Sequence, residues 1–334
     1  MKIRLLFGLT LFAVSLGAAS KDLNVWFIDV EGGQATLFLT PAGQSVLIDT
    51  GFPGNNGRDA GRIAAAAKDA GVSQIDYLLI THYHGDHVGG VPAIAAKLPI
   101  KNFVDHGETV EKTPQGQKLY DDYLKEVAKG NRIVVKPGDK LPVKGLDWTI
   151  VSAAGKVLEK PLPGAGKANP FCEAYKAKDA DPTENAQSTG SRIVFGRFRV
   201  VDMGDLTWNK EHDLMCPDNK LGETDVFIVS HHGQDISNSP VLVQALHPKV
   251  AIMNNGERKG GQVEAWETVH TSPGLIDLWQ LHFSAVGGQQ HNTDEKMIAN
   301  MKTEGDAGNF LKLTAHADGH FEVSNPATGF SKRY

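Results

Sequence analysis

The chain has 334 residues, enough for one large domain or two smaller ones. Apolar residues make up 41% and charged residues 22%, a globular balance that excludes a mainly disordered or collagen-like chain. The formal net charge of −5 gives no support for a protein whose main task is binding nucleic acid.

Residues 1–20 have the features of a secretory signal peptide. Lys2 and Arg4 precede an apolar stretch that is too short for a membrane-spanning helix, and small residues follow it up to Ser20. We therefore expect cleavage, export to the periplasm or the extracellular space, and a mature chain of residues 21–334 without a membrane span. The alternative is an uncleaved membrane anchor.

The first half of the chain alternates strands with helices. The expected strands, which are apolar and partly β-branched, lie at residues 23–30, 36–40, 45–51, 75–81, 101–106, 132–135 and 147–152. The expected helices lie at residues 57–71, 91–98 and 113–129. Thr113 caps the last of these, and Pro114 occupies its first turn.

A long segment at residues 153–190 interrupts this alternation. It is rich in Pro, Gly, Ala, Lys and Asp, which predicts a loop. A loop of this length inside a compact domain is usually functional or disordered. We expect it to cover the functional site.

Strands and helices then resume. The expected strands are residues 191–196, 197–205, 224–230 and 249–256, and residues 310–324 form a hairpin with an Asp-Gly turn. The expected helices are residues 239–247 and one that starts near Ser272–Pro273 and is followed by a strand. Two mixed halves without a linker predict one domain, residues 21–334, in which two sheets pack together with helices outside.

The chain has two cysteines, Cys172 and Cys216, both in loop-like surroundings. In an exported protein an even number of cysteines predicts a disulfide. Two free thiols or two metal ligands are the alternatives, but the spacing matches no zinc motif.

Residues 81–90 (THYHGDHVGG) concentrate histidines directly after a buried strand. Loops at the carboxyl ends of strands are where α/β proteins bind ligands, and imidazole with carboxylate suits zinc. His82 and His84 can point the same way from an extended segment. Asp86 and His87 follow a glycine-assisted turn and can face a second ion. A chance histidine-rich turn is the alternative.

The HxHxDH pattern is the signature of the metallo-β-lactamase superfamily, which this chain resembles over roughly residues 25–256. The segments FIDVEGGQATLF, MGDL and HHG are similar to one branch, the competence-protein (ComEC/Rec2-like) hydrolase domains and phosphorylcholine esterases. The resemblance implies an α/β (α+β) fold: an αββα sandwich of two mixed β-sheets with helices on the outer faces.

The resemblance also implies roles at a binuclear site. The implied metal ligands are His82 and His84 for the first ion, Asp86, His87 and His231 for the second, and Asp205 as a bridge. Asp49 would hydrogen-bond a ligand histidine. Asp86 and His232 are the expected catalytic residues, with His232 moving a proton or contacting an oxyanion; simple packing is the alternative for His232.

Many superfamily members supply a third histidine to the first ion, but the corresponding VSAAG segment, residues 151–155, has no ligand. His106 is the nearest candidate, and a satisfied or substrate-facing histidine is the favoured alternative. Asn185 and Ser188 precede a strand and would contact substrate. His282, in the segment WQLHF, would line the pocket, although such aromatic segments more often belong to the core.

These features predict an exported hydrolase with two divalent ions, most simply zinc, that acts on a small phosphate ester or phosphodiester. The alternatives are hydrolysis of another ester or amide, such as a lactone or β-lactam, and a non-catalytic metal-binding protein of the same fold. No strong nucleic-acid binding is expected.

Overall fold

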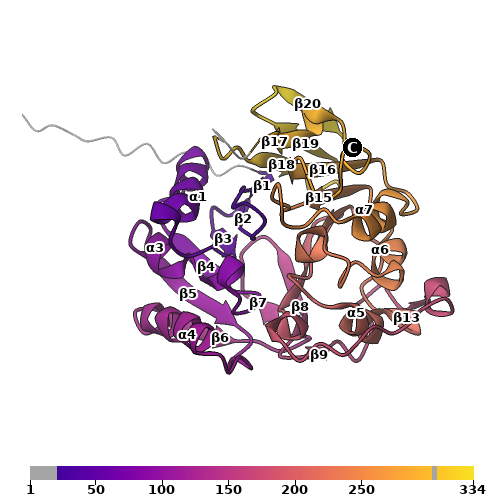
Figure 1. Ribbon diagram of the computed structural model, residues 1–334, viewed down its shortest axis with the longest axis horizontal. Coiled ribbons are helices and arrows are strands. Elements are labelled where there is room, and N and C mark those ends of the chain that lie inside the picture. Colours follow the sequence, from indigo (N-terminus) through magenta and orange to yellow (C-terminus); the bar gives the residue numbers. More distant parts are fainter. Residues whose placement is uncertain (1–20, 303–306) are drawn as a thin grey trace, which may run out of the picture.

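The structure is a computed structural model that describes residues 21–302 and 307–334 (Figure 1). The expected signal peptide lies outside the described residues. Within them, two nine-stranded sheets stack face to face and helices cover their outer faces. None of the helices in this part of the chain is both long and apolar enough to cross a membrane.

The first sheet combines an antiparallel half with a parallel half, in which β3 to β6 run parallel. Its order is β20 (Phe330–Arg333), β19 (Phe321–Asn325), β18 (Leu311–Ala315), β1 (Leu23–Phe27), β2 (Thr36–Leu39), β3 (Ser45–Ile48), β4 (Ile75–Leu79), β5 (Ile100–Asp105) and β6 (Asn131–Val134). The antiparallel β18–β19 pair is the expected hairpin. β20, which was not expected, adds the edge strand.

The second sheet is also mixed, with β12, β14, β15, β16 and β17 parallel. Its order is β17 (Ile298–Asn300), β16 (Asp277–His282), β15 (Val250–Met253), β14 (Val226–Ile228), β12 (Phe198–Asp202), β11 (Gly190–Phe195), β8 (Asp147–Ala153) and β7 (Lys140–Leu141), with β9 (Lys156–Val157) beside β8. A separate two-stranded ribbon joins β10 (Lys167–Ala168) to β13 (Asp218–Asn219).

Helices flank both sheets (Figure 1). Those on the first sheet are α1 (Arg58–Asp69), α2 (Gly85–Val88), α3 (Val91–Ala95) and α4 (Pro114–Val127). Those on the second sheet are α5 (Trp208–Met215), α6 (Pro240–Leu246) and α7 (Val263–His270). Short 3₁₀ turns are η1 (Asn55–Gly57), η2 (Pro170–Cys172), η3 (Glu184–Gln187), η4 (Ser230–Gly233) and η5 (Glu295–Met297). The αββα sandwich expected from the sequence is confirmed.

Burial on both faces explains why so many strands are continuous apolar runs. In β1, Phe27 lies in the core between the sheets, where Trp148 of β8 also packs. The neighbouring Trp26 faces the other way, into the core under α1 and α4. A third core lies under α5, α6 and α7. Since both sheets contribute to the middle core, neither sheet buries its inner face alone.

One expected element is wrong. The helix expected to begin near Ser272–Pro273 does not form, and the helix of this region is α7, which ends at His270. Ala265, Trp266 and Val269 of α7 are buried at helical spacing. The following DLWQLH segment pairs in parallel with β15 as β16. Its run of large apolar residues is the pattern of a fully buried strand, which periodicity alone does not separate from a helix.

Candidate metal centre

The histidine-rich loop follows β4 and is fastened to the end of β3. Asp49 Oδ1 accepts a hydrogen bond from Thr81 N at 2.8 Å, and Asp49 Oδ2 accepts one from Thr81 Oγ1 at 2.6 Å. The far end of the loop approaches the same segment, because a Cβ on Gly90 would lie 2.1 Å from the carbonyl oxygen of Thr50. Only glycine permits this approach, so the loop is held at both ends.

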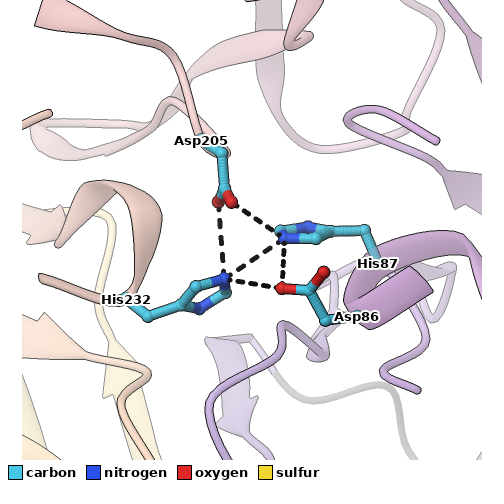
Figure 2. Close-up of side chains that lie close together, drawn as sticks. All are labelled: Asp86, His87, Asp205 and His232. Carbon is cyan, nitrogen blue, oxygen red and sulfur yellow. Dashed lines mark hydrogen bonds and ion pairs between the residues drawn. The ribbon is translucent and has the colours of Figure 1, made fainter. Parts of the chain in front are cut away.

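Four buried side chains converge between the two sheets: Asp86, His87, Asp205 and His232 (Figure 2). Each offers one ligand atom, and these atoms all lie within 4.8 Å of one another. His87 Nε2 is 3.2 Å from His232 Nε2 and 3.2 Å from Asp205 Oδ2. His232 Nε2 is 3.2 Å from Asp86 Oδ2. We call these four residues the central cluster.

The central cluster comes from three turns at the carboxyl ends of parallel strands. Asp86 and His87 follow β4, Asp205 follows β12, and His232 follows β14. The parallel strands β12 and β14 bring the turns of Asp205 and His232 to the same end of the second sheet, and the stacking of the two sheets brings the turn after β4 of the first sheet to them. A Cβ on Gly204 would lie 2.8 Å from Thr81 Cβ, so the Asp205 turn packs directly on the loop after β4.

The donor set fits a divalent ion. Burial favours the neutral form of Asp86 and Asp205, but the surrounding histidines outweigh it and hold the pKa of both carboxyls well below the usual range. Buried carboxylates of this kind are paired or coordinate a metal. Moreover, Asp205 Oδ1 is buried and accepts no hydrogen bond from the described residues, and its neighbour His232 Nε2 lies 3.5 Å away. Two imidazoles with two carboxylates form a ligand set that suits zinc.

His82 and His84 lie beside the central cluster. His82 Nε2 is 3.0 Å from His84 Nδ1 and 3.8 Å from Asp205 Oδ2. Burial, helped by His87, lowers the pKa of His82 well below its ordinary value. The ring is therefore neutral at pH 7, which is the form that binds a metal. His84 is partly exposed, and its Nε2 lies 3.6 Å from Glu111 Oε1.

Both histidines of the HHG turn lie next to Asp205, but only His232 belongs to the central cluster. The sequence assigned His231 to the second ion and His232 to proton transfer, but the structure brings His232 into the central cluster. His231 Nε2 lies 3.2 Å from Asp205 Oδ2, the oxygen that His87 also approaches, and His231 Nδ1 lies 3.1 Å from Ser237 Oγ. Both histidines have positive φ, 52° and 56°, and this left-handed turn decides which ring faces the cluster.

The comparisons with known proteins agree with this geometry. Residues 29–168 match the family described as the metallo-beta-lactamase superfamily. This segment of the chain, which carries the HxHxDH motif, is therefore similar to the metallo-β-lactamase superfamily.

Two curated proteins and one solved structure are similar to parts of this chain. ComE operon protein 3 of Bacillus subtilis (strain 168) is 26% identical over 192 residues, 56% of this chain and 21% of that protein. A UPF0173 metal-dependent hydrolase of Cupriavidus metallidurans is 38% identical over 88 residues, 25% of this chain and 27% of that protein. The metallo-beta-lactamase fold protein YhfI of Bacillus subtilis aligns with 77% of this chain and 95% of its own, at 12% identity and a TM-score of 0.44. The chain spans about a quarter of the length of these two curated relatives.

His106, the candidate third ligand of the first ion, is engaged elsewhere. Its Nε2 lies 3.0 Å from Glu184 Oε2, and its ring packs against Tyr83 at 4.6 Å between centroids. The fully buried Glu184 also accepts hydrogen bonds from Tyr83 N and from Thr109 Oγ1. His106 and Glu184 therefore brace the backbone between His82 and His84. No sequence motif pointed to Glu184.

The end of the 153–190 segment reaches the site, as expected, because Thr189 N donates to Thr81 O at 2.8 Å. Ser188 is fully buried and accepts a hydrogen bond from Asp205 N at 3.2 Å. Its hydroxyl therefore holds the backbone of Asp205, whereas the sequence predicted a substrate contact for Ser188. Asn185 is 8% exposed, and its Oδ1 has no hydrogen-bond partner among the described residues.

His282 does not line the site. It is fully buried, with Nε2 2.9 Å from Asp29 Oδ2 and 3.6 Å from Glu31 Oε2. Arg62 Nη1 pairs with the same Asp29 oxygen at 2.6 Å. The expected substrate contact is replaced by a buried charge network, and the neighbouring Trp279 is part of the core.

Cys172 and Cys216 form a disulfide, with Cα atoms 5.9 Å apart. The bridge ties η2 to the end of α5 and so anchors the middle of the long segment.

Lys259 was missed by the sequence analysis. Its ammonium forms an ion pair with Asp86 Oδ2 at the edge of the central cluster. A single Lys in a glycine-rich turn has no pattern that distinguishes it from a solvated side chain.

Proposed function

We propose that this protein is an exported, binuclear metal-dependent hydrolase that acts on phosphate esters or phosphodiesters. The convergence of the four buried donors of the central cluster carries the proposal. The similarity to the superfamily supports hydrolysis, as does the similarity to a protein described as a metal-dependent hydrolase. The resemblance of the FIDVEGGQATLF, MGDL and HHG segments to the branch that contains phosphorylcholine esterases favours a phosphate ester or phosphodiester over a lactone or β-lactam.

Two zinc ions fit the donors best. We assign His82 and His84 to the first ion and Asp86, His87 and His232 to the second, with Asp205 between them. This assignment keeps the bridge expected from the sequence and replaces His231 by His232 at the second ion. Two such ions, when bound, polarise the ester and supply a water acidic enough to attack it at neutral pH.

The chain's own side chains prepare this site. Asp49 orients His87 through Nδ1, Ser188 holds the backbone of Asp205, and Glu184 holds that of Tyr83. These contacts fix the donors before substrate arrives, so no reorganisation is needed during the reaction.

We also propose that residues 21–334 form one exported domain after loss of residues 1–20. The core shared by the two sheets supports a single domain. The disulfide supports an oxidising compartment, because such bonds persist mainly outside the cytosol.

The test is a substrate screen on metal-reconstituted protein: bis-p-nitrophenyl phosphate, a chromogenic cephalosporin and a lactone, with Asp205→Ala as the control. We expect hydrolysis of the phosphodiester and a loss of at least a thousandfold in Asp205→Ala. Turnover of the lactam or lactone alone would contradict the substrate class. Metal binding without any turnover would contradict the enzyme proposal itself.

A further inference from the structure

We propose that Lys259 forms an anion-binding subsite beside the central cluster and positions a negatively charged oxygen of the substrate. This inference rests on the proposed function and specifies its substrate class as anionic esters, such as phosphodiester monoanions. The subsite is defined by Lys259, Asp86 and the turn of residues 256–261.

The backbone of Lys259 is fixed relative to the central cluster. Gly256 N donates to Lys259 O at 2.9 Å, which closes the turn after β15. Gly261 N donates to His232 O at 2.9 Å, which fastens this turn to the one that carries His232. The position of Lys259 is therefore tied to that of a cluster residue.

Two consecutive glycines let the Lys259 stem and the Asp86 turn approach the same segment. Gly32 has φ +81°, and a Cβ there would lie 2.9 Å from Lys259 Cβ. A Cβ on Gly33 would lie 2.5 Å from the carbonyl oxygen of Asp86. The Gly-Gly pair of the FIDVEGGQATLF segment is thus required sterically. A side chain at Gly32 would displace Lys259, and one at Gly33 would displace Asp86.

The Lys259 ammonium lies between the cluster and solvent. Its side chain is 33% exposed, and the Phe52 ring flanks Nζ at 5.3 Å from the centroid. Its partner, Asp86 Oδ2, also lies 3.2 Å from His232 Nε2 and 3.3 Å from His87 Nε2. This carboxylate oxygen therefore faces the cluster on one side and Lys259 on the other.

An ammonium in this position favours an anionic ligand. Lysine carries three rotatable donors on a flexible stem, so one carboxylate oxygen leaves donors for a second acceptor. A divalent ion held by the cluster and the ammonium repel each other, and an anion placed between them is attracted by both. A phosphodiester supplies such a charged oxygen, whereas a neutral ester does not.

The test compares Lys259→Met with Arg258→Met, which removes a charge from the exposed neighbour in the same turn. Binding of inorganic phosphate to the full, metal-loaded protein is measured by calorimetry. Metal content and chelator competition are measured in parallel. We expect Lys259→Met to weaken phosphate binding at least tenfold with unchanged metal affinity, and Arg258→Met to change it less than twofold. Lys259→Arg should restore part of the affinity.

Equal phosphate affinity in Lys259→Met and the parent protein would overturn the inference. So would tighter metal binding with unchanged phosphate affinity, because Lys259 would then only compete with the ion for Asp86. If phosphate binding depends on Lys259 but the protein has no phosphodiesterase activity, the anion subsite is supported and the proposed function is contradicted. If the protein is a phosphodiesterase whose KM does not change in Lys259→Met, the proposed function is supported and the subsite is contradicted.

Discussion

Asp49 Oδ2 lies 2.7 Å from Nδ1 of His87, and both side chains are fully buried. Burial opposes protonation of His87, but the carboxylates of Asp205, Asp86 and Asp49 outweigh it and raise its pKa well above the ordinary value. The N–H at Nδ1 donates to Asp49, so Nε2 faces the central cluster and is the nitrogen that must give up its proton when a metal binds. The end of β3 thus selects which nitrogen of His87 is available to a metal.

Replacing Asp49 with Asn should weaken binding of the second ion by about tenfold to a hundredfold, because an outer carboxylate fixes the ring and raises its basicity. The Asn oxygen can still accept the hydrogen bond from Thr81 N, so the fold should survive. Competition with a chromogenic chelator measures the affinity, and circular dichroism checks the fold. Unchanged affinity in a folded Asp49→Asn protein would show that Asp49 serves only Thr81.

His232 and His231 offer a matched pair for testing the ligand assignment. His232→Ala removes a donor from the central cluster and should reduce bound metal from two ions towards one. His231→Ala leaves the cluster donors in place and should retain more metal than His232→Ala. Elemental analysis after dialysis against a fixed free-metal concentration gives both numbers. The opposite ranking would restore the assignment made from the sequence.

The sequence was sufficient where function depends on local spacing. The HxHxDH loop, Asp49 and Asp205 each follow an apolar strand, and parallel strands within each sheet, with the stacking of the two sheets, bring them together. The local backbone conformation could not be predicted from the sequence. In His231 and His232 two successive positive φ values decide which ring points inward. Contacts between distant turns were not readable either. Glu184 and Lys259 acquire their roles only from Tyr83, His106 and Asp86, to which no short motif connects them.

The disulfide should stabilise the fold without serving the metal site. Replacing both Cys172 and Cys216 with Ser should lower the free energy of unfolding by about 2–4 kcal/mol. Without the bridge the unfolded chain is no longer held in a closed loop, so its conformational entropy rises. Urea unfolding of parent and variant measures the change, and metal content should remain the same. Alkylation of two thiols in the native, unreduced protein would contradict the bridge.

Asn185 remains a candidate for substrate binding. Thr183 caps the N-terminus of η3, because its Oγ1 accepts the hydrogen bond from Asn185 N. The Asn185 side chain is therefore not needed as a cap. Its buried Oδ1 has no partner among the described residues, which suits a group that meets a ligand. Asn185→Ala should therefore raise KM or lower kcat by about tenfold while metal content stays constant. Unchanged kinetics with lowered thermal stability would assign Asn185 a purely structural role.

Glu211 provides a pH-dependent contribution to stability away from the metal ligands. This fully buried residue of α5 accepts hydrogen bonds from Asn238 N at 2.8 Å and from Ser239 N at 2.7 Å. Ser239 caps α6, so the carboxyl joins two helices on the second sheet. Burial dominates over these hydrogen bonds and raises the pKa of Glu211 to about 7.

A raised pKa means that the folded state binds the proton more tightly than the unfolded state does. The stabilisation is therefore fully present below the ordinary pKa of a glutamic acid and is lost as pH rises through about 7. Between the ordinary pKa of glutamic acid and about 7 the unfolded state is ionised and the folded state is not, so one such group lowers the free energy of unfolding by at most about 1.4 kcal/mol per pH unit; above about 7 the loss levels off. Glu211→Gln cannot ionise, so the difference in the free energy of unfolding between parent and variant should shift in favour of the variant between about pH 4.5 and about pH 7 and stay constant above that. Urea unfolding of both proteins at each pH measures this shift, and Glu264→Gln, on the exposed side of α7, is the control that should show none. If the parent and Glu211→Gln lose stability in parallel across this range, Glu211 is already ionised in the fold, and its two backbone hydrogen bonds outweigh its burial.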